Sequence, residues 1–229
     1  MNSDASPATD NFPGYTLDAP CRARFTDRGS RFLAEARETV DKMAAHRFLA
    51  TIKSNHPDAS HHVYSWRLSP PEIPELASDD GEPPGTAGLP VLGVLRSMHL
   101  VQVTLVIARY FGGTKLGKPG LIQAYRESAR HCLQGAPKRR LLSYVAFEMS
   151  WPYTMQHFVD ELTHEFRLLV LNAQYTERID ATLYCPADNS RSAEKKIRHY
   201  AHTGIRFRNK GTRYRPEPVH KSTHTNCNP

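Results

Sequence analysis

The sequence lacks a long apolar segment. Its most apolar stretch, Val103–Ala108, is far shorter than the roughly 20 residues that a membrane-spanning helix needs. The first 14 residues contain two aspartates and two prolines but no lysine or arginine, so they lack the basic start of a secretory signal. We therefore expect a cytoplasmic protein that makes no contact with a membrane.

Cysteine is also scarce, and its spacing fits no metal site. None of the four cysteines lies at C-x-x-C spacing or is followed by a histidine at zinc-finger spacing: Cys21, Cys132, Cys185 and Cys227. Of the 12 histidines only His61 and His62 are adjacent, and neighbours on a strand point to opposite faces. The sequence therefore predicts free thiols, with no metal and no other cofactor.

Acidic residues are rare in the C-terminal sixth of the chain. Residues 191–229 hold ten lysines and arginines against two acids, a net charge of +8, whereas the whole chain carries +7. Clustered cations attract phosphate polyanions such as RNA and release their counterions on binding. A solvated basic segment that aids solubility explains the same composition, so both interpretations stay open.

Apolar periodicity predicts an N-terminal domain over residues 19–137. Strands are expected at residues 21–26, 31–39, 63–68 and 101–111, and helices at residues 40–55, at residues 89–98 and after Gly120. The segment Ser69–Gly88, rich in proline, glycine and acids, is expected to be a long loop. Together these elements indicate an α/β sandwich.

A second pattern fills residues 138–215, beyond a linker expected at residues 135–140. Strands at residues 141–151, 170–175, 179–184 and 205–208 alternate with a helix capped by Thr154 and a basic helix capped at residues 188–190. The order β-α-β-β-α-β is that of a ferredoxin-like sandwich. The fold class is therefore α+β with two domains, flanked by a disordered start at residues 1–18 and a disordered basic tail at residues 216–229.

A glycine loop follows the most apolar predicted strand. Gly112–Lys118 satisfies the G-x-x-x-x-G-K pattern of a P-loop, but Pro119 replaces the serine or threonine that would hold magnesium, so we expect no nucleotidase. An anion site without hydrolysis stays open, because glycines let backbone approach a ligand, a helix N-terminus favours anions, and Lys115 and Lys118 add charge. Alternatively, the glycines only permit a tight turn.

Three carboxylates, Asp79, Asp80 and Glu82, cluster within four residues of the expected long loop. Clustered carboxylates bind magnesium or act as general acids and bases. Carboxylates in a turn also accept hydrogen bonds from the backbone or cap the helix that follows. No nucleophile or paired base is evident nearby in the sequence, so we do not expect catalysis at this acidic loop.

Several motifs resemble the signature of the IMPACT/YigZ family. They are DGEPPGTAGLP at residues 80–90, RYFGGTKLG at 109–117 and GLIQAY at 120–125, with upstream matches SRF at 30–32 and HPDASH at 56–61. The resemblance covers about residues 20–136. It implies an N-terminal α+β domain related to ribosomal-protein and elongation-factor modules, followed by a ferredoxin-like domain. That pair is similar to the last two domains of elongation factor G, which touch ribosomal RNA.

The resemblance also implies a link to translation. Eukaryotic members are implicated in translational control through protein partners, whereas bacterial members are generally not assigned a reaction. Motif residues whose role stays unspecified are His61, Asp80, Gly81, Glu82, Gly85, Thr86 and Gly88. Two residues depart from the usual pattern: Pro119 stands where glycine is usual and Pro84 where serine is common. A ligand that contacts those positions would be bound differently by this chain.

We therefore predict a non-catalytic binding protein linked to translation regulation, which docks on RNA, the ribosome or a translation factor. Its expected contacts are the cations of both domains and the loop glycines: Arg109, Gly112, Gly113, Lys115, Gly117, Lys118, Arg126, Arg130, Lys195, Lys196, Arg198, Arg206, Arg208 and Lys210. The alternative is an enzyme acting on a phosphate-bearing small molecule, with His61 or His62 as acid or base and the glycine loop as anion hole. A third interpretation is purely structural: the two loops lock the helix after Gly88 against the helix after Gly120.

Overall fold

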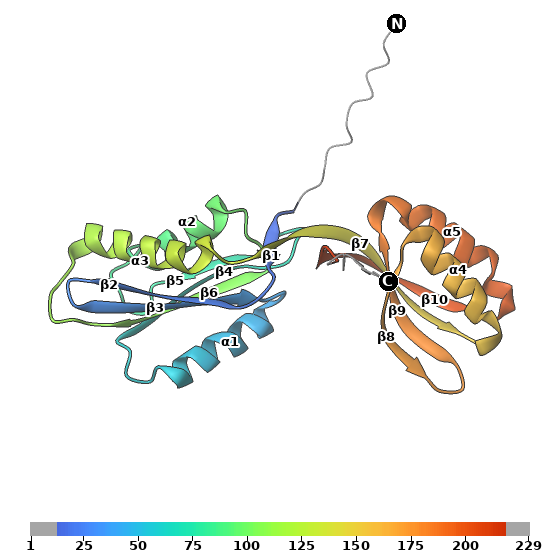
Figure 1. Ribbon diagram of the computed structural model, residues 1–229, viewed down its shortest axis with the longest axis horizontal. Coiled ribbons are helices and arrows are strands. Elements are labelled where there is room, and N and C mark those ends of the chain that lie inside the picture. Colours follow the sequence, from blue (N-terminus) through green and yellow to red (C-terminus); the bar gives the residue numbers. More distant parts are fainter. Residues whose placement is uncertain (1–12, 219–229) are drawn as a thin grey trace, which may run out of the picture. The chain divides into compact units, whose positions relative to one another are not determined.

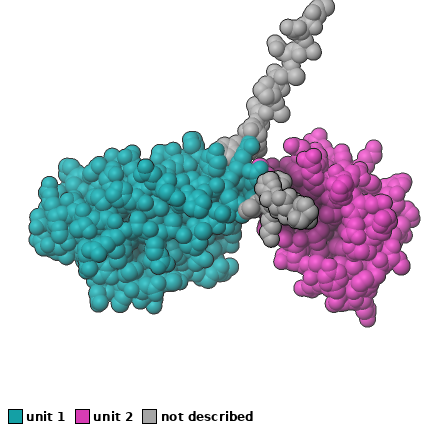
Figure 2. All heavy atoms as spheres, viewed as in Figure 1, with its two compact units in different colours: residues 1–141, 216–229 teal, residues 142–215 magenta. Residues whose placement is uncertain are grey.

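The computed structural model describes residues 13–218, which divide between two compact units (Figure 2). Of the described residues, 13–141 and 216–218 belong to unit 1, and 142–215 belong to unit 2. Both combine helices with antiparallel strands, so the α+β fold class is confirmed. Of the disorder predicted at residues 1–18 and 216–229, the parts at residues 1–12 and 219–229 lie outside the described residues. The prediction was wrong at Pro216, which ends a strand, and the Glu217 amide donates a 2.8 Å hydrogen bond to the Arg140 carbonyl.

Unit 1 is built on a five-stranded antiparallel sheet. Its strand order is β2 (Cys21–Asp27), β3 (Ser30–Glu38), β6 (Val103–Tyr110), β4 (His61–Arg67) and β5 (Glu75–Ser78). Seven of the eight residues of the central strand β6 are buried, which confirms the expectation that this apolar run is covered on both faces.

Helices cover both faces of this sheet (Figure 1). On one face lie α2 (Gly88–Ser97) and α3 (Gly117–Gln134), and on the other lies α1 (Lys42–Asn55). The helix α1 begins at Asp41, whose Oδ1 accepts a hydrogen bond of 2.7 Å from the Ala44 amide. Within residues 13–218, no helix combines the length and the apolar character that crossing a membrane requires.

Unit 2 has the predicted order β7 (Lys138–Trp151), α4 (Gln156–Phe166), β8 (Leu169–Tyr175), β9 (Ile179–Pro186), α5 (Ser190–His199) and β10 (Arg206–Pro216). Its sheet is ordered β10-β7-β9-β8, as in a ferredoxin-like sandwich. Buried side chains of both helices and of the central strands form one core, which includes Phe147, Trp151, Phe158, Leu162 and Ile197.

Several element predictions were wrong where a strand is stabilised by distant residues. Residues 15–17, expected to be disordered, form β1 (Tyr15–Leu17), which pairs with residues 138–140, expected to be a linker. The long loop contains β5, whose Glu75 bridges Arg67 and Arg96. The pairings of β1 and β5 depend on tertiary context, which local sequence patterns do not encode. The predicted helix cap was also wrong, because Thr154 lies in a single 3-10 turn and does not cap α4.

The cysteines match the expectation of free thiols as far as they are described. Cys21, Cys132 and Cys185 are free, and Cys132 is buried in α3, where its sulfur lies 3.6 Å from that of Cys21. Cys227 lies outside the described residues.

Two glycines of α2 are expected to respond oppositely to alanine. At Gly88 a Cβ atom would lie 2.6 Å from the Ser78 amide nitrogen, so Gly88→Ala should destabilise unit 1 by about 1–3 kcal/mol. At Gly93 a Cβ would meet nothing within 4 Å, so Gly93→Ala should stabilise it by about 0.5–1 kcal/mol through helix propensity. Urea denaturation of both variants measures the difference, and equal effects would contradict the close packing of α2 on β5.

Candidate functional site

A buried carboxylate joins three elements of unit 1. Glu82 follows β5 in the acidic loop, and its side chain is 3% exposed. Its Oε1 accepts hydrogen bonds of 2.6 Å from Arg109 Nη1 at the end of β6 and of 2.7 Å from the Tyr125 hydroxyl on α3. Burial, together with the Glu82 charge, raises the pKa of Tyr125, so the phenol keeps its proton and acts as a donor.

Histidine and aspartate side chains extend this cluster toward the surface. In the His61 ring, Nε2 lies 3.8 Å from Glu82 Oε1, and Nδ1 lies 2.9 Å from the Asp80 carbonyl oxygen. The Asp80 carboxylate accepts a 2.7 Å hydrogen bond from the His62 amide and lies 3.3 Å from Lys53 Nζ on α1. The His62 ring lies between two oxygens, with Nε2 2.9 Å from the His56 carbonyl and Nδ1 3.9 Å from Asp80 Oδ2. The His61, His62, Asp80 and Glu82 side chains therefore each have a partner within unit 1, whereas Nε of Arg109 is buried without a hydrogen-bond partner.

The neighbouring carboxylate, Asp79, caps α2. Its two oxygens accept hydrogen bonds of 2.9 Å from the amides of Gly85, Ala87 and Gly88. Burial opposes ionisation of this carboxyl, but the three amide donors outweigh it, so the pKa of Asp79 is lowered. Asp79 thus satisfies the amides at the start of α2, the capping role that sequence reasoning held open for the acidic cluster.

The remaining motif residues of the acidic loop shape its backbone. Gly81 and Gly85 adopt positive φ values of 88° and 77°, and the Thr86 hydroxyl donates to the Pro83 carbonyl at 2.7 Å. Gly88 touches the β5 backbone, as described above, and its carbonyl accepts a 2.8 Å hydrogen bond from Ser65. These contacts support the structural interpretation of the acidic loop: it anchors α2 and, through Glu82, α3.

The glycine loop, defined here as Phe111–Lys118, lies on the surface. All its residues except Leu116 are exposed. It leaves the sheet where Gly112 packs on the β2–β3 turn: a Cβ at Gly112 would lie 1.9 Å from the Gly29 carbonyl carbon, so only glycine fits. The Gly112 amide donates to Ser30 Oγ at 3.2 Å, which fixes the base of the loop.

Beyond Gly112 the backbone amides of the loop point to no internal acceptor. None of the amides of residues 113–117 donates a hydrogen bond to another residue of the described chain. The start of α3 has no side-chain cap either, in contrast to α2. Lys115 and Lys118 are exposed beside these amides. Free amides, a helix N-terminus and two cations together form a surface suited to an anion.

Sequence reasoning missed three residues in or beside the glycine loop. Phe111, its first residue, is 50% exposed, and its ring lies 5.7 Å from the guanidinium carbon of Arg109. Arg28 is exposed in the β2–β3 turn, next to the Gly29 that packs on Gly112, and exposed Arg31 stacks on Tyr110 with 4.9 Å to the ring centre. Phe111 directly follows an apolar strand and directly precedes Gly112, a position that offered a signal in the sequence. The two arginines were brought near the loop only by strand pairing.

Three arginines of the predicted phosphate-binding set lie elsewhere in unit 1. Arg109 is 5% exposed, and its guanidinium also lies 3.3 Å from Ser30 Oγ, so it is committed to the interior and we remove it from the set. Arg126 and Arg130 are exposed on α3, where they line a groove against α2.

The predicted cations of unit 2 divide between two layers. Lys195, Lys196 and Arg198 lie on α5, and the latter two form ion pairs with Glu165 and Glu194. Three others belong to β10: Arg206, Arg208 and Lys210.

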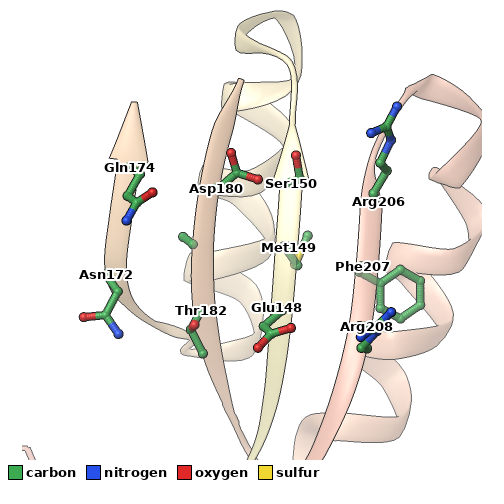
Figure 3. Close-up of a pocket in the computed structure, with 11 residues that line it drawn as sticks. Glu148, Met149, Ser150, Asn172, Gln174, Asp180, Thr182, Arg206, Phe207 and Arg208 are labelled. Atoms are coloured by element: carbon green, nitrogen blue, oxygen red, sulfur yellow. The ribbon is translucent and has the colours of Figure 1, made fainter. Parts of the chain in front are cut away.

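The β10 cations border a sheet face that also carries acids. Figure 3 shows the open face, a hollow of about 540 Å³ where Glu148 and Asp180 accompany Arg206 and Arg208. Lys210 Nζ lies 3.1 Å from Glu148 Oε1. The predicted cations of unit 2 are therefore partly paired with acids and are divided between α5 and β10.

Removing the buried carboxylate should be costly. Glu82→Gln leaves the Arg109 guanidinium buried without a counter-charge, so we expect a loss of about 3–5 kcal/mol in unfolding free energy. Tyr125→Phe removes one hydrogen bond to a charged acceptor and should cost about 1.5–3 kcal/mol. Urea denaturation of both single variants and the double variant gives their coupling. A loss below about 1 kcal/mol for Glu82→Gln, well under the cost of a broken buried pair, would contradict the cluster.

Acid should abolish the contribution of Asp79. Because its pKa is lowered in the folded state, its stabilisation is complete above the ordinary aspartate value of 3.8 and is lost as the pH falls through the folded value. Asp79→Ala should cost about 0.5–2 kcal/mol at pH 7, as for other helix caps, and less at pH 3. Urea midpoints at both pH values measure this, with exposed Asp58→Ala as control. A cost that persists unchanged at pH 3 would refute the role of the charge.

Comparison with known proteins agrees with these motifs. A family model described as the Impact N-terminal domain matches residues 28–133. The chain is 33% identical over 157 residues to the IMPACT family member YvyE of Bacillus subtilis. This alignment covers 68% of this chain and 71% of YvyE. It is 27% identical over 180 residues to the IMPACT family member YigZ of Escherichia coli, covering 78% and 88% of the two chains.

A solved structure supports the same grouping. The crystal structure of a hypothetical protein matches with a TM-score of 0.64 and 26% identity, over 85% of this chain and 95% of that one. The match spans nearly all of the solved chain, so the two proteins share their fold along its length. With the family model and the relatives, it leads to one conclusion: this chain belongs to the IMPACT family.

Proposed function

We propose that this chain is a non-catalytic, cytoplasmic binding protein linked to translation regulation, which docks on RNA through the glycine loop. The observation that carries the proposal is the set of unpartnered backbone amides at residues 113–117, beside Lys115 and Lys118 at the open start of α3. The family's eukaryotic members, implicated in translational control, supply the link to translation, and the ribosome is the RNA-rich partner that this role implies.

Each part of the loop suits one part of a nucleotide. The amides and the two lysines suit phosphate oxygens, because donors and positive charge meet at one place. The exposed Phe111 ring offers a face on which an unpaired base stacks, a contact worth about 1–3 kcal/mol per base. Arg28 and Arg31 extend the positive charge along the neighbouring turn. Such a surface favours single-stranded or looped RNA over a regular duplex.

Unit 2 contributes less to this proposal. Lys195, Arg206 and Arg208 make no ion pair with another described residue and are the cations best placed to reach phosphate. Glu148 and Asp180 on the same sheet face as the two arginines would repel it. We therefore assign the main RNA contact to unit 1.

The enzyme alternative gains no specific observation. It requires His61 or His62, together with the acidic loop, to present an acid or base. His61 Nδ1 lies 2.9 Å from the Asp80 carbonyl oxygen and His62 Nε2 lies 2.9 Å from the His56 carbonyl oxygen. Asp79 holds the start of α2, and Glu82 is buried under Arg109 and Tyr125. Among the described residues, no group of three or more histidine, cysteine or acidic side chains is placed to hold a metal ion.

A salt series tests the RNA contact. Binding of a single-stranded RNA oligonucleotide should weaken with salt, with a log–log slope of about −0.7 per phosphate contact. Lys115→Gln/Lys118→Gln should therefore weaken binding and make the slope shallower by about 1.4. The reason is the loss of two phosphate contacts from an exposed loop that the core does not need.

A matched control removes two cations elsewhere. Lys42→Gln/Arg47→Gln changes exposed residues of α1, on the opposite face of the sheet from α3, and should leave the slope unchanged. Equal effects of the two double variants would show that only overall charge matters. A slope near zero for the unmodified protein would rule out phosphate contacts altogether.

A further inference from the structure

A groove runs between α2 and α3 on the outer side of unit 1. Its volume is about 490 Å³. Leu89, Pro90 and Gly93 form its α2 side, and Ile122, Arg126 and Arg130 form its α3 side. Gly85 of the acidic loop lines it, but Glu82, Arg109 and Tyr125 of the buried cluster do not. No residue of the glycine loop lines it, and its first α3 residue is Ile122, in the second turn of that helix. The groove is thus a surface separate from the proposed RNA site.

The floor of the groove is open and apolar. Gly93 lies in the exposed middle of α2, where an added Cβ would meet nothing within 4 Å. Glycine is a poor helix former, so its presence there is not explained by the stability of α2. One turn earlier on the same helix face, Leu89 is 58% exposed. An uncovered leucine beside a glycine gap leaves room for an apolar side chain from outside.

The α3 wall of the groove is basic. Arg126 and Arg130 are one helical turn apart, so their side chains lie on the same face of α3. Arg130 lies 3.4 Å from Glu127, whereas Arg126 forms no ion pair within the described part of the chain. No carboxylate lines the groove. A ligand that fills it therefore meets an aliphatic floor and an unbalanced positive wall.

We propose that this groove binds an acidic amphipathic helix of a protein partner. Leucine-like side chains at helical spacing would pack on Leu89 and Ile122 above Gly93, and carboxylates one turn apart would pair with Arg126 and Arg130. RNA fits less well, because the groove offers no aromatic ring for a base and its aliphatic floor has no use for phosphate. The inference stands independently of the RNA contact at the glycine loop.

A displayed library of random 16-residue peptides, selected on the full chain, tests this occupant. Enriched peptides should carry leucine, isoleucine or phenylalanine at i, i+4 spacing together with aspartate or glutamate. Gly93→Leu fills the groove and should weaken their binding at least tenfold, while Gly93→Ala, which adds one methyl group, should change it less than threefold. Arg126→Glu/Arg130→Glu should also weaken binding at least tenfold, and thermal melting confirms that each variant is folded.

Three results would overturn the proposal. They are a selection that enriches no acidic amphipathic peptide, enriched peptides that bind Gly93→Leu as well as the unmodified chain, and a loss of RNA binding in Gly93→Leu. The last result would assign the groove to nucleic acid. Single-stranded RNA binding that is unchanged in Gly93→Leu but lost in Lys115→Gln/Lys118→Gln supports two separate surfaces, so the two proposals fail by different measurements.

Discussion

The buried charge pair between Glu82 and Arg109 is the constraint on which the rest of unit 1 depends. The Arg109 guanidinium, in a residue that is 5% exposed, is tolerated only beside a carboxylate. The equally buried Glu82 carboxylate needs a second hydrogen-bond donor, and the Tyr125 hydroxyl supplies it. The three residues come from a loop, a strand and a helix that are distant in sequence. Their single meeting point fixes where β6 ends and how α3 lies on the sheet. Beyond Arg109 only Tyr110 still pairs with β3, and the glycine loop then emerges at the surface.

The two motif loops resolve the same physical problem in opposite ways. Each precedes a helix, and each helix begins with amides that lack a partner within the helix. The start of α2 is closed by Asp79, which accepts from the amide of Gly88, the first residue of α2, and from the amides of Ala87 and Gly85 just before it. The start of α3 is left open, because Leu116 and the glycines before it carry no acceptor. A protein that needed only stability would close both ends, so the open end is the one that suits a ligand.

Local sequence patterns predicted the helices and strands that bury an apolar face, but they missed the short strands that depend on pairing with distant residues. The strand β6 and the helices α2 and α3 followed from periodicity, as did the order of elements in unit 2. The short strands β1 and β5 did not, because their few residues are held by partners far along the chain. The same limit applied to the site. The glycine loop was visible in the sequence, whereas the burial of Arg109 was not, since its partner Glu82 lies 27 residues away.

Charge counted along a sequence differs from charge presented on a surface. The C-terminal excess of +8 suggested the stronger polyanion contact, yet in unit 2 the cations lie on a helix layer and a sheet edge, with Glu148, Glu165 and Glu194 beside them. In unit 1 a smaller number of cations adjoins free amides and an exposed aromatic ring, which concentrates positive potential at one place. The same helix that begins in the glycine loop carries Arg126 and Arg130 to the groove. Since Tyr125 ties that helix to the buried charge pair, one internal contact positions both outward surfaces.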